Sequence, residues 1–77
     1  MQPKLLDDLP WYAVTDYVMA YHHRRASGAV LFSMYWERRP DVPEFYVIYD
    51  IPTKRTWSQV SKLTAQCVLN HLLNPNT

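Results

Sequence analysis

The stretch AVLFSMYWERRPDVPEFYVIYDI, residues 29–51, decides the fold that we expect. Successive side chains of a strand point to opposite faces, and the alternation within this stretch fits two strands, residues 29–38 and 45–51. Residues 39–44 lie between them and contain two prolines, which a central strand does not tolerate. The stretch therefore predicts an antiparallel hairpin with residues 39–44 as its loop.

A helix is expected before the hairpin, from Leu9 to Arg25. Asp8 is a good N-cap residue, and Pro10 lies in the first turn, where its missing N–H costs nothing. Gly28 is the only glycine of the chain and follows the expected helix, at the position where a C-terminal cap commonly has a left-handed backbone conformation.

A second helix is expected after the hairpin. Thr56 and Gln59 match a capping box, in which two side chains satisfy exposed backbone N–H groups, and Asn74-Pro75 ends the helix. At helical spacing one side of this segment collects Trp57, Val60, Leu63, Thr64, Cys67, Val68, His71 and Leu72.

The predicted fold class is α+β, in the order helix–strand–strand–helix, with the hairpin packed against two helices. Residues 1–77 form one domain, with 1–7 and 75–77 as flexible ends, and Trp36 and Trp57 lie in the core. The hairpin is apolar on both faces and has two free edges, which favours a homodimer that completes the sheet. The alternative is a monomer with one helix on each face.

Composition excludes several classes of protein. The chain has 77 residues, of which 48% are hydrophobic and 14% aromatic, so it is not a disordered tail. One Cys excludes an internal disulfide, and one Gly excludes a glycine-rich phosphate loop. No secretory signal is recognisable, and the longest low-charge stretch, residues 9–21, is too short to span a membrane. We therefore expect a cytoplasmic protein with no membrane partner.

Neither a metal centre nor a catalytic centre is expected. Cys67 and His71 have i, i+4 spacing that suits zinc, but His22 and His23 diverge on a helix and no second ligand pair exists. Cys67 is expected in the core, away from any base, and no paired carboxylates lie in an apolar cleft. The sequence therefore predicts a non-enzymatic protein without a cofactor.

Charged residues gather at two poles of the expected fold. The ends of the elements bring together His22, His23, Arg24, Arg25, Lys54 and Arg55 at a basic pole. The opposite pole holds Asp7, Asp8, Asp41 and Glu44, with Arg38 and Arg39 beside them. The basic pole suits a phosphate or an acidic patch on a protein. The alternative is that these are ordinary solvated charges at the ends of helices.

Apolar residues off the core face of each helix suggest interfaces. Tyr12 and Met19 lie on the polar side of the first helix, and with the basic pole they form the predicted partner-binding site: Tyr12, Met19, His23, Arg24, Arg25, Lys54 and Arg55. Leu69 and Leu73 form a predicted secondary interface on the second helix. The alternative for each pair is that it completes a small core.

The sequence contains no recognisable family motif. Its size and composition favour a small interaction protein that binds another protein and modulates its activity, most simply as an inhibitor by steric blocking. Accessory proteins of phages and mobile elements that act on a host target are often of this kind. The alternative is a nucleic-acid-binding regulator that holds phosphates with Arg24, Arg25, Lys54 and Arg55. In that case the hairpin offers aromatic rings for stacking on bases, from Tyr35, Trp36, Phe45, Tyr46 and Tyr49.

Overall fold

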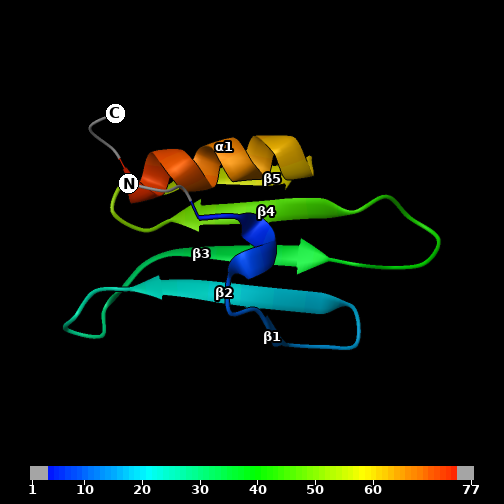
Figure 1. Ribbon diagram of the computed structural model, residues 1–77, viewed down its shortest axis with the longest axis horizontal. Helices are drawn as coiled ribbons and strands as arrows, with labels where there is room; N and C mark the ends of the chain where they lie inside the picture. Colours follow the sequence, from blue (N-terminus) through cyan, green and yellow to red (C-terminus); the bar gives the residue numbers. More distant parts are fainter. Residues whose placement is uncertain (1–3, 75–77) are drawn as a thin grey trace.

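Five antiparallel strands form one sheet in the order in which they occur along the chain (Figure 1). The computed structural model describes residues 4–74. Its elements are the 3-10 turn η1 (Leu6–Asp8), the strands β1 (Tyr12–Ala13), β2 (Val18–Arg24), β3 (Val30–Glu37), β4 (Phe45–Asp50) and β5 (Arg55–Val60), and the helix α1 (Lys62–Leu73).

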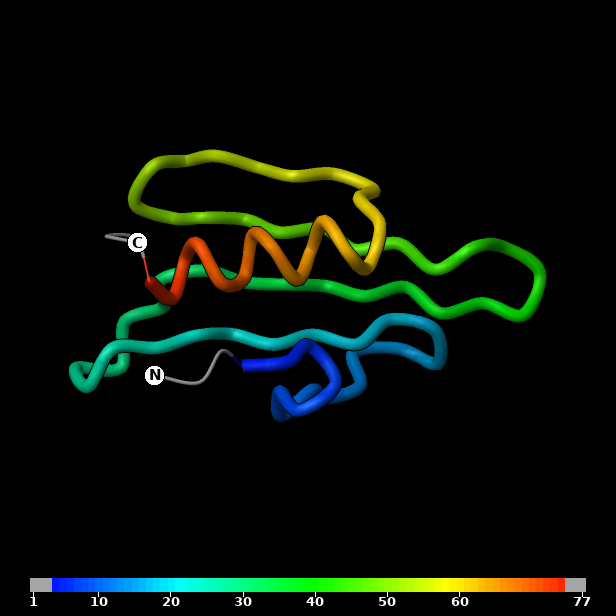
Figure 2. Tube along the Cα trace, turned by 45° about the horizontal axis from the view of Figure 1, so that its top comes forward, coloured from blue at the N-terminus to red at the C-terminus, as the bar shows by residue number. Residues whose placement is uncertain are grey.

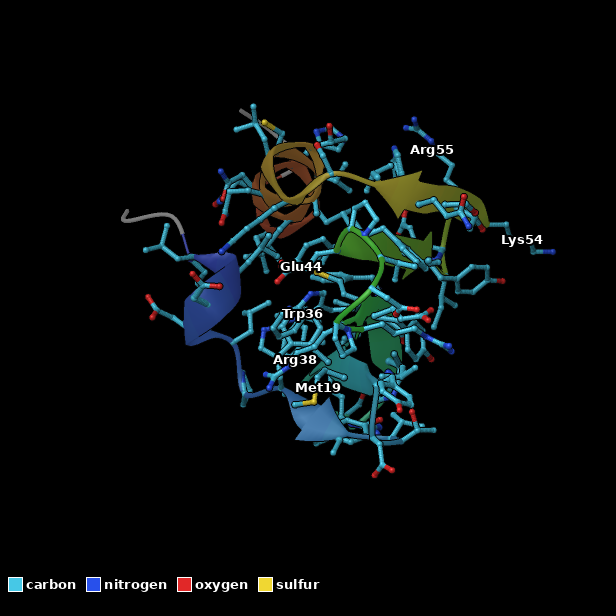
Figure 3. All side chains as sticks on the ribbon, turned by 90° about the vertical axis from the view of Figure 1, so that its right-hand side faces the viewer. Met19, Trp36, Arg38, Glu44, Lys54 and Arg55 are labelled. Atoms are coloured by element: carbon cyan, nitrogen blue, oxygen red, sulfur yellow. The ribbon has the colours of Figure 1, made fainter. Side chains whose placement is uncertain are left out.

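The register assigns each side chain to one of two faces. Tyr21 lies opposite Met34 and Met34 opposite Ile48, so these three share a face with Trp57, the partner of Ile48. α1 packs against β4 on this face, and η1 lies on the same side of the sheet (Figures 2 and 3). We call it the covered face.

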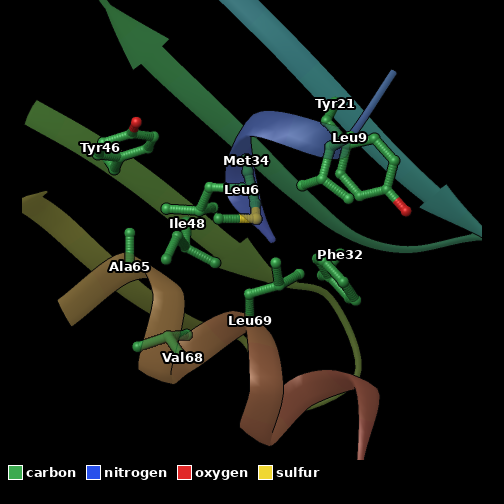
Figure 4. Packing of buried hydrophobic residues seen from close by; sticks show 10 residues of the cluster. All are labelled: Leu6, Leu9, Tyr21, Phe32, Met34, Tyr46, Ile48, Ala65, Val68 and Leu69. Carbon is green, nitrogen blue, oxygen red and sulfur yellow. The ribbon is translucent and has the colours of Figure 1, made fainter. Parts of the chain in front are cut away.

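The core lies between the covered face and these two elements. Figure 4 shows Leu6 of η1 and Leu69 of α1 near Ile48 and Met34 of the sheet, and all four side chains are fully buried. The whole cluster consists of Leu6, Leu9, Tyr21, Phe32, Met34, Tyr46, Ile48, Ala65, Val68 and Leu69.

The expected first helix is wrong, because residues 18–24 form the strand β2. In this segment Tyr21 is buried against the covered face, while Ala20 lies opposite Tyr35 on the other face. The apolar residues of this segment fit one broad side of a helix as well as the two faces of a strand. Pairing with β3 decides in favour of the strand. The Thr15 hydroxyl accepts hydrogen bonds from the backbone N–H groups of Tyr17 and Val18 and holds the turn before β2.

Gly28 has a left-handed backbone, with a φ of 93°, but in a hairpin turn rather than a helix cap. Its N–H donates to the carbonyl of Arg25 at 2.8 Å in the connection between β2 and β3. Glycine adopts this φ without steric cost.

The expected second helix is wrong in its first turns, because residues 55–60 form β5. Ser61, not Thr56, is the N-cap of α1, and its hydroxyl accepts from the N–H of Thr64 at 3.2 Å. Gln59 has a positive φ of 53° at an irregularity in the β4–β5 register. The extra residue lets Trp57 and Val60 both pack against the core.

This shift of the helix changes which of its sides is buried. Leu69 is fully buried, whereas Leu63 is 77% exposed and Cys67 is also exposed. Of the stripe expected from the sequence, only Val68 is in the buried core, and Trp57, Val60 and Leu72 pack against it.

The hairpin between residues 29–38 and 45–51 is present as β3 and β4, but its two edges are not free. β2 pairs with one edge and β5 with the other. The hairpin therefore has no free edges that would favour a homodimer, and the homodimer itself stays a prediction. Trp36 and Trp57 are half-buried and pack against the core.

Of the ends expected to be flexible, residues 1–3 and 75–77 lie outside the described residues. Leu6, within the expected flexible segment 1–7, is 1% exposed and belongs to the core. The part of the segment around Leu6 therefore packs with the rest of the domain.

Replacing Leu69 by Ala should lower the free energy of unfolding by about 2–5 kcal/mol, because it empties a fully buried position. Leu63→Ala on the outer side of the same helix should change it by less than about 0.5 kcal/mol. Urea denaturation followed by tryptophan fluorescence measures both. Equal losses for the two variants would contradict this packing of α1.

Candidate binding surface

The second face of the sheet is not covered by α1 or η1, which both lie on the opposite side (Figure 3). We call it the open face. The pairings place its side chains in three rows that cross the sheet: Tyr12, Ala20, Tyr35 and Val47; His22, Ser33, Tyr49 and Thr56; Val18, Glu37 and Phe45.

Aromatic rings contact one another along the open face. The ring centroid of His22 lies 5.5 Å from that of Tyr12 and 6.0 Å from that of Tyr35. The Nδ1 atom of His22 is 2.6 Å from the Ser33 hydroxyl, which holds the imidazole in place between the two tyrosines. Tyr12 and Tyr49 remain 47% and 41% exposed. The face thus offers ordered rings from three strands, with Tyr49 from a fourth.

The open face carries little charge. Within its three rows Glu37 is the single charged residue, and its carboxylate is paired with Arg39. The guanidinium of Arg39 also lies 5.0 Å from the ring centroid of Tyr17. Desolvating this face on binding therefore costs little electrostatic free energy.

Positive charge lies at one end of the sheet. The β2–β3 and β4–β5 connections leave the sheet at the same end (Figure 1). Arg25 and Lys54 lie in these connections and Arg24 and Arg55 at the strand ends beside them, and we call these four residues the basic end. The side chain of Lys54 extends on the side of the sheet away from α1 (Figure 3). The guanidinium of Arg24 donates to the Gly28 carbonyl oxygen at 3.0 Å. The central carbon of the Arg55 guanidinium lies 4.7 Å from the ring centroid of Trp57.

The structure separates the other residues of the predicted partner-binding site. Tyr12 lies opposite Ala20 on the open face, whereas Met19 lies opposite Trp36 on the covered face. The two side chains therefore point away from each other. An i, i+7 pair shares one side of a helix but lies on opposite faces of a strand.

His23 also lies on the covered face, stacked on Phe32 at 4.8 Å between ring centroids. Leu69 of the predicted secondary interface is fully buried in the core, and Leu73 packs against the core. These residues are part of the packing of the monomer.

The predicted partner-binding site does not include His22, Tyr35 or Tyr49 of the open face, although Tyr35 and Tyr49 are among the rings expected to stack on bases in the alternative function. Alternation along residues 29–38 and 45–51 already separates Tyr35 and Tyr49 from the core-facing residues. His22 could not be placed in the same way, because its position depends on the pairing of β2 with β3.

Burial changes the titration of groups on the covered face. Burial, and to a lesser degree the charge of Lys4, lowers the pKa of His23. The Tyr21 hydroxyl is 2.8 Å from Nδ1 of His23, and burial raises the pKa of this tyrosine. Burial likewise raises the pKa of Tyr46.

Among residues 4–74, no group of three or more His, Cys, Asp or Glu side chains could hold a metal ion. Cys67 and His71 are both exposed on α1. No helix in this part of the chain has the length and apolar character that crossing a bilayer requires.

Comparisons of the chain with protein-family models, with curated proteins and with solved structures gave no match. The residues of the open face and the basic end are therefore the basis for a functional assignment.

The lowered pKa of His23 predicts a loss of stability in mild acid. Below the ordinary value of 6.5, the unfolded chain binds protons that folded His23 resists, so the free energy of unfolding falls as the pH drops towards the folded pKa. His23→Phe keeps a ring against Phe32 but does not titrate. Urea denaturation at pH values of about 7 and about 5.5 should show a smaller loss for this variant than for the native chain. An equal loss would contradict the assignment to His23.

Proposed function

We propose that this chain is a non-enzymatic binding protein that recognises an acidic surface of another protein through the open face. The observation that carries the proposal is the makeup of that face. In an antiparallel sheet with one solvated face, core-facing apolar residues alternate along each strand with outward-facing residues, and the outward-facing residues are normally polar. Here Tyr12, Tyr35, Phe45 and Tyr49 face outward, and the one charged residue, Glu37, is already paired.

Strand propensity does not account for this composition. Aromatic and β-branched residues are frequent in strands, which explains single tyrosines or valines. It does not explain the lack of Lys and Arg in all three rows of the described open face. Aromatic residues with few charges are typical of the centre of a protein interface.

The tyrosines suit binding because they are held before a partner arrives. A tyrosine side chain has two rotatable bonds, so ordering it costs little conformational entropy. Tyr12, His22 and Tyr35 already contact one another on neighbouring strands. Preorganisation of this kind lowers the cost of association.

The basic end supports a partner with an acidic surface. Arg24, Arg25 and Lys54 lie at the margin of the domain rather than on the open face itself, whereas Arg55 lies over Trp57 on the covered face. Charges at the rim of an interface mainly accelerate encounter and select the partner, while buried aromatic side chains provide most of the affinity. Steric occlusion of the partner is the simplest way in which so small a domain modulates, and most simply inhibits, its activity.

A second candidate function is binding of single-stranded nucleic acid. The row of rings formed by Tyr12, His22 and Tyr35 favours it, because bases stack on aromatic side chains of a sheet. Such sheets also hold the phosphates along the strand of nucleic acid. The described open face has no Lys or Arg in its rows, so we favour a protein partner.

Photo-crosslinking tests the proposal. Benzoylphenylalanine placed at position 12 or 49 should crosslink to one and the same partner protein in extracts of the native cells. The matched control is position 63, which is 77% exposed but lies on α1, away from the open face. It should give no such adduct, and nuclease treatment should not remove the adducts from positions 12 and 49.

The purified partner then permits a quantitative test. Tyr49→Ala should weaken binding about tenfold, equivalent to about 1.4 kcal/mol, with little change in melting temperature. Leu63→Ala should leave binding unchanged, and charge reversal at Arg24 and Arg25 should slow association in a salt-dependent way.

Other outcomes would overturn the proposal. Adducts that nuclease destroys would point to nucleic acid, as would salt-sensitive binding of a labelled single-stranded oligonucleotide that Tyr35→Ala abolishes. An adduct between two copies of this chain would assign the open face to a homodimer. Equal crosslinking from position 63 would remove the open face as a specific site.

A further inference from the structure

A cavity of about 330 Å³ lies beside the last turn of α1, at the basic end of the sheet. Its apolar wall comes from Leu31, Phe32, Pro52 and Leu72. The polar groups at the cavity are contributed by Asp50, Thr53 and His71. The volume is within the range of small-molecule sites, near its lower limit. This cavity is separate from the open face, and the inference below does not rest on the proposed function.

Asp50 is the single acidic residue that lines the cavity, and it is 8% exposed. One carboxylate oxygen, Oδ2, accepts a hydrogen bond from the Thr53 hydroxyl at 2.5 Å. The ion pairs within residues 4–74 are Arg39–Glu37 and Lys62–Asp7, so no cation of the described chain forms an ion pair with Asp50. A carboxylate as buried as this one normally has a positively charged partner.

The nearest cation in register has another contact. Arg55 lies directly opposite Asp50 across β4 and β5. Its guanidinium is placed 4.7 Å above the ring of Trp57 and makes no ion pair with the carboxylate.

The end of α1 places a partial negative charge beside the Asp50 carboxylate at the cavity. His71 and Leu72 belong to the last turn of α1, where the helix ends at Leu73. The free carbonyl groups of a helix C-terminus carry a partial negative charge. A cation in the cavity would therefore be attracted by both the carboxylate of Asp50 and the end of the helix.

We propose that this cavity binds a primary ammonium group carried on an apolar stem. The ammonium pairs with the carboxylate of Asp50, and the stem packs along Leu31, Phe32 and Leu72. A compact ammonium fits better than a guanidinium, because the Thr53 hydroxyl already occupies one of the two oxygens that a bidentate arginine would use. A small alkylamine and the side chain of a lysine in a partner share this chemistry.

The contact between Asp50 and Thr53 also closes the turn between β4 and β5. This structural role must be kept separate from ligand binding in any test. Asp50→Asn does so, because the amide oxygen can still accept from the Thr53 hydroxyl while the charge is lost.

The test is a titration with n-hexylamine, followed through the methyl NMR signals of leucines 31 and 72. We expect saturable shifts with a dissociation constant in the millimolar range. Uncharged hexanol should bind at least about tenfold more weakly, and anionic hexanoate should not bind. These three ligands differ mainly in the charge of one end group, so the comparison isolates the contribution of the carboxylate.

Variants locate the site. Asp50→Asn should weaken hexylamine binding at least about tenfold, while Glu44→Gln should leave it unchanged. Glu44 is a suitable control because it is exposed and lines a separate groove at the opposite end of the sheet. Leu72→Phe reduces the free volume of the cavity while the Asp50 carboxylate is retained. It should also abolish binding, which keeps the proposal testable if Asp50→Asn does not fold.

A second ligand distinguishes the two sources of the amine. Binding of Nα-acetyl-lysine methylamide as tight as that of hexylamine would indicate a lysine side chain of a partner, and much weaker binding would indicate a free small amine. The proposal is overturned if hexylamine and hexanol bind equally. Binding that survives both Asp50→Asn and Leu72→Phe would also overturn it.

Discussion

The side chain of Gln66 joins two segments from opposite ends of the chain, and the packing of the domain depends on that junction. Its Oε1 accepts from the backbone N–H of Leu6 at 2.9 Å, and its Nε2 donates to the carbonyl of Lys4 at 2.7 Å. The ion pair between Lys62 and Asp7 supports the same contact. In this way η1 and α1 form one continuous cover over a single face of the sheet. A helix of 12 residues cannot cover five strands by itself.

This arrangement leaves the other face of the sheet uncovered. Both covering segments lie on one side, so the open face has no described backbone above it (Figure 3). Its small central residues, Ala20 and Ser33, are shielded by the larger side chains around them and are 0% and 7% exposed. The tyrosines beside them stand out from the sheet. The open face and the Asp50 cavity therefore differ in chemistry: the first is a broad aromatic surface, which we propose binds another protein, and the second is a small recess with one carboxylate, which we propose holds an ammonium group.

Parts of the fold could be read from local sequence because local forces decide them. The turn at residues 39–44 and the alternation on either side of it predict the hairpin of β3 and β4. The helix near the C-terminus was expected, but its start was placed at Thr56 instead of Ser61. Both residues can cap a helix, and the pairing of residues 55–60 with β4 decides which of them does.

The sequence by itself determined an aromatic hairpin, a helix near the C-terminus, and basic residues near the ends of the elements. Only the tertiary structure decided that residues 18–24 are a strand. Their apolar residues fit the spacing of a helix as well as that of a strand, and hydrogen bonding to β3 selects the strand. The tertiary structure also decided which side of each strand faces away from the core. Tyr12 and Met19 point to opposite faces, and Tyr12, His22 and Tyr35 meet on one face, because cross-strand register is set by contacts between residues far apart in the sequence.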